Sequence, residues 1–278
     1  ASARTLSLLS YSSVDIYGTG QLGSRGGLDA LTLSAAALRS YNAGEGAASF
    51  AARSIRLENP TNRVAPAPST GVASGVLRFE ADEITLGAGR VAVSGQSRVD
   101  LTASSRLLAV GSGGFEVAGG LRLETPLVTA AQAAVHGVSA GGAVSLVRPA
   151  VASAAEAGGL GARFSIEGAA VSLDSEIVLP SGELIARATA GDLRLGSNAA
   201  SLINLAGVSK VFLDVSRFTD GGTATLESAT GSVVLGEGGT VDVSAPAGGG
   251  NAGGINVRAQ NGGFDLLGVM KGGATTGR

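Results

Sequence analysis

The residues with the most specific chemical spacing are Gly18, Gly20 and Gly23, which match a dinucleotide-binding loop. They follow an apolar stretch at 14–17 that is predicted to be a strand, and an acidic residue, Glu45, lies 22 residues after Gly23. A dinucleotide site needs a helix after the third glycine, because the N–H groups of its first turn face the pyrophosphate. The following residues, 24–27, include two more glycines, which disfavour a helix. We interpret the motif as a turn and expect no cofactor.

Two pairs of carboxylates, Asp82 with Glu83 and Asp174 with Glu176, are candidates for acid–base or calcium chemistry. If residues 174–176 are extended, Asp174 and Glu176 lie on the same side of the strand. Such sites also need a stacking aromatic residue, a cationic partner or several further acids, and the nearby sequence supplies none of these. We interpret both pairs as solvated corners between strands.

His136 is the only histidine, and the chain has no cysteine, which argues against a transition-metal site. No G-x-S-x-G motif accompanies it, so we expect His136 at a corner of the chain. Residues 236–244, GEGGTVDVS, resemble one turn of a glycine–aspartate calcium roll, but the pattern is not tandem. The sequence therefore predicts no catalytic, cofactor-binding or metal-ligating residue, and it assigns no binding residue.

The elements that would position any site are short apolar–x–apolar triplets, most regular between residues 77 and 124. Alternation of this kind indicates strands with one buried face. The triplets are Leu77/Phe79, Ile84/Leu86, Val91/Val93, Val99/Leu101, Leu108/Val110, Phe115/Val117 and Leu121/Leu123.

Every third triplet returns after about 22 residues, as from Leu77 to Val99 and from Val99 to Leu121. This spacing predicts an all-β fold, a parallel β-helix with three short strands and about 20–24 residues per coil. Parallel crossovers are right-handed in nearly all proteins, so we expect a right-handed coil. Hydrophobic residues make up 44% of the 278 residues but aromatic residues only 4%, which suits a narrow interior of aliphatic side chains.

Outside this stretch, residues 35–52 could be helical by their alanine content, but the glycines and the spacing favour two strands. Further inward pairs are expected at 144–146 and between 164 and 213, the last being Val211/Leu213. Asp100 and Asp242 are each expected to point outward between two inward aliphatic residues. The segments 188–196 and 228–236 resemble each other, and the interval between them corresponds to two of the expected coils.

We expect a single β-helical segment over residues 1–278, interrupted by loops near 59–75, 148–163 and 245–254. The first loop contains Pro60, Pro66 and Pro68, and proline cannot donate a hydrogen bond to a strand ladder. Function on such repeats often lies in loops that leave the repeat, so these three loops are candidate binding regions.

The near balance of 20 Lys+Arg against 22 Asp+Glu provides no basic field for a nucleic acid. No apolar run is long enough to span a membrane, and the first residues do not have the pattern of a signal peptide. Since neither end of the chain shows the polar cap that a solenoid needs, we expect an internal piece of a longer protein.

Several phrases resemble the filamentous haemagglutinin family of large exoproteins from Gram-negative bacteria. They are SYSSVDIYGTGQLG (10–23), EADEITLGAGRVAVSG (80–95), GGFEVAGGLRLETPLVTA (113–130) and VVLGEGGTVDVSAPAGGGNAGGINVRA (233–259). The resemblance implies a β-helical shaft that a two-partner transporter carries across the outer membrane, recognising a domain outside this segment. It also implies a location on the cell surface or outside the cell.

From these observations we expect a non-enzymatic shaft segment of a secreted surface adhesin that mediates attachment or biofilm matrix contacts. The expected partners, besides the transporter, are glycan, matrix or host-surface receptors and other copies of the filament. Two alternatives stay open at this stage. One is the stalk of a contact-dependent toxin-delivery protein, and the other is a β-helical polysaccharide lyase or hydrolase.

Overall fold

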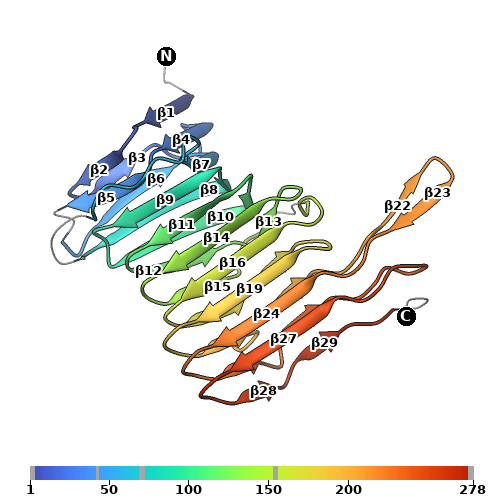
Figure 1. The fold of residues 1–278 in the computed structure, drawn as a ribbon. Helices are drawn as coiled ribbons and strands as arrows, with labels where there is room; N and C mark the ends of the chain where they lie inside the picture. The colour runs from blue at the N-terminus through green and yellow to red at the C-terminus, as the bar shows by residue number, and fades with distance from the viewer. Residues whose placement is uncertain (1–3, 42–43, 69–72, 153–155, 275–278) are drawn as a thin grey trace. The chain divides into compact units, whose positions relative to one another are not determined.

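The structure is a computed structural model that describes residues 4–41, 44–68, 73–152 and 156–274 (Figure 1). The described residues form 29 strands and no helix, so the chain is all-β. They divide into two compact units. Unit 1 comprises residues 1–126 and 136–155, and unit 2 comprises residues 127–135 and 156–278.

Unit 1 consists of parallel strands that are hydrogen-bonded in three successive sets, which we call columns. The first column contains β1 (Thr5–Leu9), β4 (Ala30–Ser34), β7 (Ser54–Glu58) and the second halves of β8 (Val76–Leu86) and β10 (Arg98–Ala109). The second contains β2 (Ser13–Tyr17), β5 (Ala37–Tyr41), β9 (Gly89–Ser94), β11 (Gly113–Val117) and β14 (Val135–Ala140). The third contains β3 (Gly20–Leu22), β6 (Ala47–Ala51), the first halves of β8 and β10, β12 (Gly120–Glu124) and β15 (Val144–Val147). One passage through the three columns is called a coil.

The interior of unit 1 is formed by aliphatic and aromatic side chains stacked from coil to coil. In the third column Leu22, Phe50, Phe79, Leu101, Leu123 and Leu146 lie opposite one another in successive strands. The rings of Phe50 and Phe79 stack with their centroids 5.4 Å apart. Each fully buried side chain of this kind contributes roughly 1.5–3 kcal/mol to folding, so the ladders account for much of the stability of the unit.

The regular stretch matches the sequence prediction except at one triplet. Leu108 and Val110 are only partly buried, whereas Leu107 and Ala109 are 1% and 0% exposed. The prediction that Leu108 and Val110 point inward is therefore wrong by one residue. The reason is an irregularity between Ala103 and Arg106, where the register against β8 shifts, because one extra residue reverses which side chains face inward.

The proline-containing loop takes the place of a strand in the second column. Residues 59–68 contain no strand, and Ala37 of β5 pairs directly with Ala92 of β9. Asn59 holds the loop, because its side-chain amide donates to the carbonyls of Arg63 (2.9 Å) and Arg90 (2.8 Å). The lack of a strand in residues 59–68 is consistent with the expected loop, and residues 69–72 lie outside the described part. The two strands favoured within residues 35–52 are also present, as β5 and β6.

Unit 2 repeats the arrangement with its own three columns. The first contains β13 (Leu127–Ala130), β18 (Glu176–Val178), β21 (Ser201–Asn204), β26 (Gly239–Asp242) and β29 (Val269–Lys271). The second contains β16 (Arg163–Gly168), β19 (Glu183–Ala188), β24 (Thr223–Ser228) and β27 (Gly254–Ala259). The third contains β17 (Val171–Asp174), β20 (Leu193–Leu195), β25 (Val233–Leu235) and β28 (Phe264–Leu266).

The two similar segments at 188–196 and 228–236 are neighbours in this stack. Leu193 lies opposite Val233 and Leu195 opposite Leu235 in adjacent parallel strands. The prediction of two coils between them is therefore wrong, because they are separated by a single long coil. Its additional length forms a hairpin of β22 (Ser209–Phe212) and β23 (Val215–Phe218), which pair antiparallel and project from the stack (Figure 1).

This hairpin also overturns the prediction that Val211 and Leu213 point into the coil. Val211 is 68% exposed and Leu213 is fully exposed. An alternating triplet indicates a strand with two different faces, but it does not show whether that strand belongs to the stack or to an insertion.

The other two predicted loops also lack strands in their described residues, apart from the last residue of each. In the loop at 148–163, the next strand begins at Arg163, and residues 153–155 lie outside the described part. In the loop at 245–254, β27 begins at Gly254. One continuous shaft over residues 1–278 stays a prediction.

Candidate functional site

The glycine motif at 18–23 forms a turn and a strand. Residues 20–22 are β3, a turn follows at 25–27, and residues 4–41 contain no helix that could receive a pyrophosphate. Gly23 is required for a structural reason, because its φ is +79° and a Cβ atom there would lie 2.3 Å from the carbonyl oxygen of Ala51. Glu45 lies in an exposed turn before β6. These residues are not arranged as a nucleotide site.

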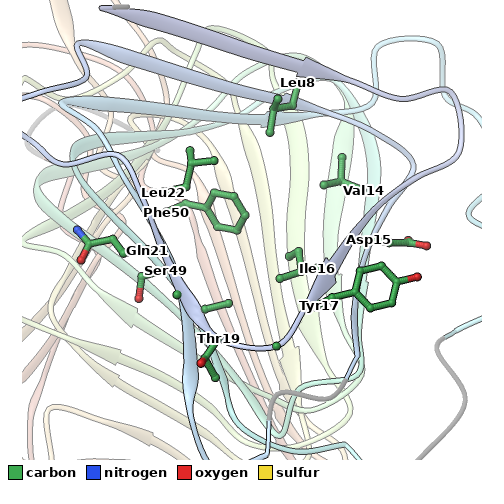
Figure 2. Close-up of a pocket in the computed structure, with 13 residues that line it drawn as sticks. Leu8, Val14, Asp15, Ile16, Tyr17, Thr19, Gln21, Leu22, Ser49 and Phe50 are labelled. Carbon is green, nitrogen blue, oxygen red and sulfur yellow. The ribbon is translucent and has the colours of Figure 1, made fainter. Parts of the chain in front are cut away.

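A hollow of about 330 Å³ lies within the first coil of unit 1, beside this motif (Figure 2). Figure 2 shows the side chains of Leu8, Val14, Ile16, Leu22 and Phe50 around it. All five belong to the stacked interior of the unit. These five side chains give the hollow an apolar wall. None of them could act as an acid, a base or a nucleophile.

The carboxylates of Asp82 and Glu83 have separate partners at the bend of β8. Asp82 accepts a hydrogen bond from the Ser104 hydroxyl at 3.1 Å, and its Oδ1 lies 3.6 Å from a guanidinium nitrogen of Arg25. Glu83 accepts a hydrogen bond of 2.7 Å from Nε of Arg106. Each acid is therefore part of a contact between neighbouring segments, and the two have different partners.

Asp174 is buried, with 2% of its surface exposed, so the prediction that it is a solvated corner is wrong. It accepts hydrogen bonds from the backbone N–H groups of Asn198 (3.1 Å) and Ala199 (3.4 Å), from Nδ2 of Asn198 (2.8 Å) and from the Ser172 hydroxyl (2.8 Å). Burial alone would raise the pKa of Asp174, but these hydrogen bonds outweigh it, so the pKa lies below its ordinary value. Asp174 fixes the loop of the following coil.

Glu176 does not act together with Asp174. Asp174 ends β17 and Glu176 begins β18, with a bend at the buried Ser175 between them. The two carboxylates therefore lie on strands of different columns and do not share one side of one strand, as the spacing had suggested.

His136 is 4% exposed and lies in β14, so the prediction of a corner position is wrong. Its Nε2 lies 3.0 Å from the carbonyl oxygen of Gly87, and its Nδ1 accepts a hydrogen bond of 2.9 Å from the N–H of Gly137. This pattern fits the neutral imidazole with its proton on Nε2. Burial lowers the pKa of His136 more than the two backbone contacts raise it. The ring is therefore a structural link between two coils that are not adjacent, because β11 lies between β14 and β9, the strand that follows Gly87.

The described residues contain no group of three or more acidic, histidine or cysteine side chains that could hold a metal ion. Residues 239–242 within the glycine–aspartate segment form β26, an ordinary member of the first column of unit 2. Among the described residues, no helix is long and apolar enough to cross a membrane.

A surface feature that sequence reasoning missed is a strip of aromatic and charged side chains along β2 and β5. Tyr17 and Tyr41 lie opposite each other, and their rings stack with centroids 5.1 Å apart. Next to them Arg39 makes two hydrogen bonds to Asp15, at 2.9 and 2.8 Å, and its guanidinium lies 5.8 Å from the centre of the Tyr41 ring. The hydrogen bonds from Arg39 lower the pKa of Asp15. We call these four residues together with Tyr11 and Arg63 the tyrosine strip.

The loop at 59–68 borders this strip. The guanidinium of Arg63 lies 5.5 Å from the centre of the Tyr11 ring, and Nη1 of Arg39 donates to the carbonyl of Ala67 at 3.5 Å. Tyr11 is 64% exposed and Tyr17 is 70% exposed. The three tyrosines of the chain are thus gathered on one outer surface, where rings and polar groups are accessible.

The sequence contained a signal for the tyrosine strip. Asp15 precedes Arg39 by the same interval as Tyr17 precedes Tyr41, and that interval is close to the length of one coil. Residues one coil apart lie side by side on neighbouring strands, so the spacing could have indicated both contacts.

The outer faces of both units also have arginine–carboxylate pairs between neighbouring coils. In the second column of unit 2, Glu167, Arg187, Glu227 and Arg258 alternate in sign across four paired strands. Arg187 lies 3.8 Å from Glu167 and 4.0 Å from Glu227, and Arg258 lies 3.1 Å from Glu227. Exposed pairs contribute little individually, but alternation avoids placing like charges opposite each other.

The chain matches no family model, no curated protein and no solved structure.

Proposed function

We propose that the chain is a non-enzymatic shaft segment of a secreted bacterial surface adhesin of the filamentous haemagglutinin type. In this proposal each unit is part of a right-handed parallel β-helix, and the protein reaches the cell surface through a two-partner transporter. The proposal combines the resemblance in sequence with the parallel columns of strands. The observation that carries it is the set of inward ladders, such as Phe79, Leu101 and Leu123, which continue in register from coil to coil.

The candidate catalytic residues support a structural role. Asp174 is enclosed by four hydrogen bonds, His136 links two coils, and Glu83 is engaged with Arg106. A catalytic acid or base has to reach the proton that it transfers, and the buried side chains of Asp174 and His136 do not. These contacts favour a shaft over a lyase or hydrolase.

The tyrosine strip is the surface best suited to adhesive contacts. Tyrosine presents a large apolar ring with a hydroxyl group, so it combines contact area with hydrogen bonding. Tyr17 rests on Tyr41, and Arg39 is fixed by Asp15, so little conformational entropy is lost when a partner binds. The proposed partners are glycan, matrix or host-surface receptors.

The adhesive role is tested by coating beads with the chain and measuring their retention under flow on epithelial cells and on matrix-coated surfaces. We expect retention of wild-type beads and a loss of at least about half of it for the double variant Tyr17→Ala/Tyr41→Ala. Leu267→Ala, at a site that is 65% exposed after β28 and lies outside both the tyrosine strip and the three predicted loops, is the matched control and should be neutral. Wild-type beads that are not retained on any of these surfaces would contradict the adhesive role.

The shaft itself is tested by an experimental structure of the purified chain. Three parallel columns with a right-handed winding would support the proposal, and a left-handed winding would contradict it. Turnover of acidic polysaccharides that is lost in Glu176→Gln would replace the structural proposal with an enzymatic one.

A further inference from the structure

The hairpin of β22 and β23 forms a two-stranded sheet of its own, in which the strands run antiparallel and leave the stack (Figure 1). Its two strands are joined by the two-residue turn Leu213–Asp214. Unit 2 does not need this hairpin to continue its columns, since β21 pairs with β26 and β19 pairs with β24 across the insertion.

The base of the hairpin is held firmly on unit 2. The N–H of Thr219 donates to the carbonyl of Val208 at 3.0 Å, and the Thr219 hydroxyl accepts from the N–H of Val208 at 2.8 Å. The same hydroxyl lies 2.6 Å from the hydroxyl of Ser181, and the N–H of Gly207 donates to the carbonyl of Ser244 at 2.9 Å. The base therefore presents the tip in a defined direction.

The tip exposes aliphatic side chains. Leu213 is 100% exposed, Val211 is 68% exposed and Val215 is 45% exposed. Single exposed aliphatic residues are ordinary, but three so close together at the end of a projecting element form a local apolar surface.

Two further features of the hairpin weaken it as an isolated element. Leu213 has a φ of +55°, a conformation that in two-residue turns is usually occupied by glycine or asparagine. Lys210 and Arg217 lie directly opposite each other in the antiparallel pair, and like charges in this position are destabilising. Local departures of this kind are found mostly at functional sites.

A single partner would compensate the exposed aliphatic residues and the paired positive charges. We propose that the β22–β23 hairpin is a membrane-docking element, whose tip enters the surface of an anionic lipid bilayer. Leu213, Val211 and Val215 contact the acyl chains, and Lys210 and Arg217 contact lipid phosphate groups. This inference goes beyond the proposed shaft and does not depend on it.

The dimensions of the hairpin fit this arrangement. Lys210 lies three positions before Leu213, which is roughly 10 Å of extended strand. Amphipathic elements bury their apolar side about 5–10 Å deep at the boundary between headgroups and acyl chains. Long basic side chains at that distance reach the phosphates while their methylene groups remain in apolar surroundings.

The charges near the tip determine how strongly it should bind an anionic membrane. Asp214, in the turn itself, opposes contact with anionic lipid, so Lys210, Arg217 and Asp214 together carry one net positive charge. Asp220, further toward the base, accepts a hydrogen bond of 2.7 Å from the N–H of Asn251 and belongs to the stem. Binding should therefore be weak, sensitive to salt and stronger in Asp214→Asn.

The test is co-sedimentation of the whole chain with vesicles of equal parts phosphatidylglycerol and phosphatidylcholine, compared with vesicles of phosphatidylcholine alone. Wild-type chain should partition onto the anionic vesicles. Leu213→Asn should lower the partition coefficient by more than about tenfold. Asparagine tolerates a positive φ, so this variant keeps the hairpin folded while it removes the most exposed apolar side chain of the tip.

Lys210→Gln should lower the partition coefficient about fivefold, and Arg217→Gln should do the same. Lys271→Gln, which changes the other lysine of the chain, is the matched control and should bind like the wild type. Circular dichroism spectra of all variants should be unchanged and none should melt at a lower temperature than the wild type, which separates this test from the test of the shaft.

Three results would overturn the proposal. One is equal binding by the wild type and Leu213→Asn, and another is binding to anionic vesicles that does not respond to Lys210→Gln. The third is a dimer that depends on Leu213 in a chain that does not bind vesicles, which would identify a second copy as the occupant of the tip.

Discussion

The stretch 76–124 of unit 1 and the stretch 201–239 of unit 2 have a similar alternation of apolar and polar residues, but they fold differently. In the first region each strand pairs with the strand one regular coil further along the chain, as Val99 does with Leu121. In the second, Ser201 pairs with Gly239 only after a much longer excursion, because the hairpin is inserted between them. The alternation of apolar residues therefore shows which side chains share one face of a strand. Only the pairing of that strand with its neighbours shows whether the face is buried in the stack.

The largest expected difference between these regions is in the free energy of unfolding, when a leucine in each region is replaced by aspartate. Leu101 is 1% exposed and lies between Phe79 and Leu123, whereas Leu213 is fully exposed. Leu101→Asp buries an unpaired charge and should lower the free energy of unfolding by more than about 4 kcal/mol. Leu213→Asp should change it by less than about 0.5 kcal/mol. Denaturant titrations followed by circular dichroism measure both, and equal losses would show that the facing of these residues is assigned wrongly.

An intermediate effect is expected at Asp174, which anchors the loop before the interrupted coil. Asp174→Ala leaves the N–H groups of Asn198 and Ala199 without this acceptor and should cost about 2 kcal/mol at pH 7. Asp242→Ala removes a carboxylate that accepts a backbone hydrogen bond from Ser244, and it should cost less. A cost no larger at Asp174 than at Asp242 would contradict the anchoring role.

The cost of Asp174→Ala should also depend on pH in a defined direction. The pKa of Asp174 in the folded chain lies below the ordinary value of 3.8, so the folded state favours the ionised carboxylate. The stability that the ionised Asp174 carboxylate adds to the folded chain is fully present above about pH 4, and it is lost as the pH falls through the lowered pKa. The difference between wild type and Asp174→Ala should therefore narrow below pH 4, and a difference that widens there would contradict the assignment.

A smaller effect is expected at Asp100, on the outer face of the regular region. The sequence predicted that Asp100 points outward between two inward aliphatic residues. In the structure Asp100 is only 8% exposed, because Arg98 makes hydrogen bonds of 2.6 and 3.1 Å to it and Arg78 lies 3.7 Å away. Asp100→Asn should therefore cost about 1 kcal/mol, less in high salt. Denaturant titrations at low and high salt measure this cost.

The control for this prediction is the exposed pair of Arg90 and Glu116, in which the arginine side chain is 74% exposed. Arg90→Gln should cost less than about 0.5 kcal/mol. If Asp100→Asn costs no more than this control, the covering arginines do not stabilise the outer face.

The sequence was sufficient to predict the strand class and most inward residues, because burial and period-two alternation are local signals. Leu77, Phe79, Val99 and Leu101 are 0–1% exposed, as the alternation predicted. The bulge after Ala103 could not be predicted, since an extra residue in a serine-containing stretch has no distinctive composition. Val211 and Leu213 were placed in the interior because alternation does not show whether a strand belongs to the stack or to an insertion.

The candidate sites were harder to predict because their partners are distant in the sequence. The surroundings of Asp174 come from residues 198 and 199 of the next coil, and those of His136 come from Gly87. The residues next to Asp174 and His136 in the sequence therefore do not show whether these side chains are buried and hydrogen-bonded or exposed at a corner. The tyrosine strip was predictable in principle, because Tyr17 and Tyr41 are separated by the length of one coil.

The loop at 59–68 has a consequence for the geometry of unit 1. At this level the first and third columns each contain a strand, β7 and the first half of β8, whereas in the second column β5 contacts β9 directly. Neighbouring strands are about 4.8 Å apart, so that face is shorter than the other two by roughly this amount. We therefore expect the axis of unit 1 to curve toward the shortened face. Omitting one strand from one column is thus a way for such a protein to encode the direction in which it bends.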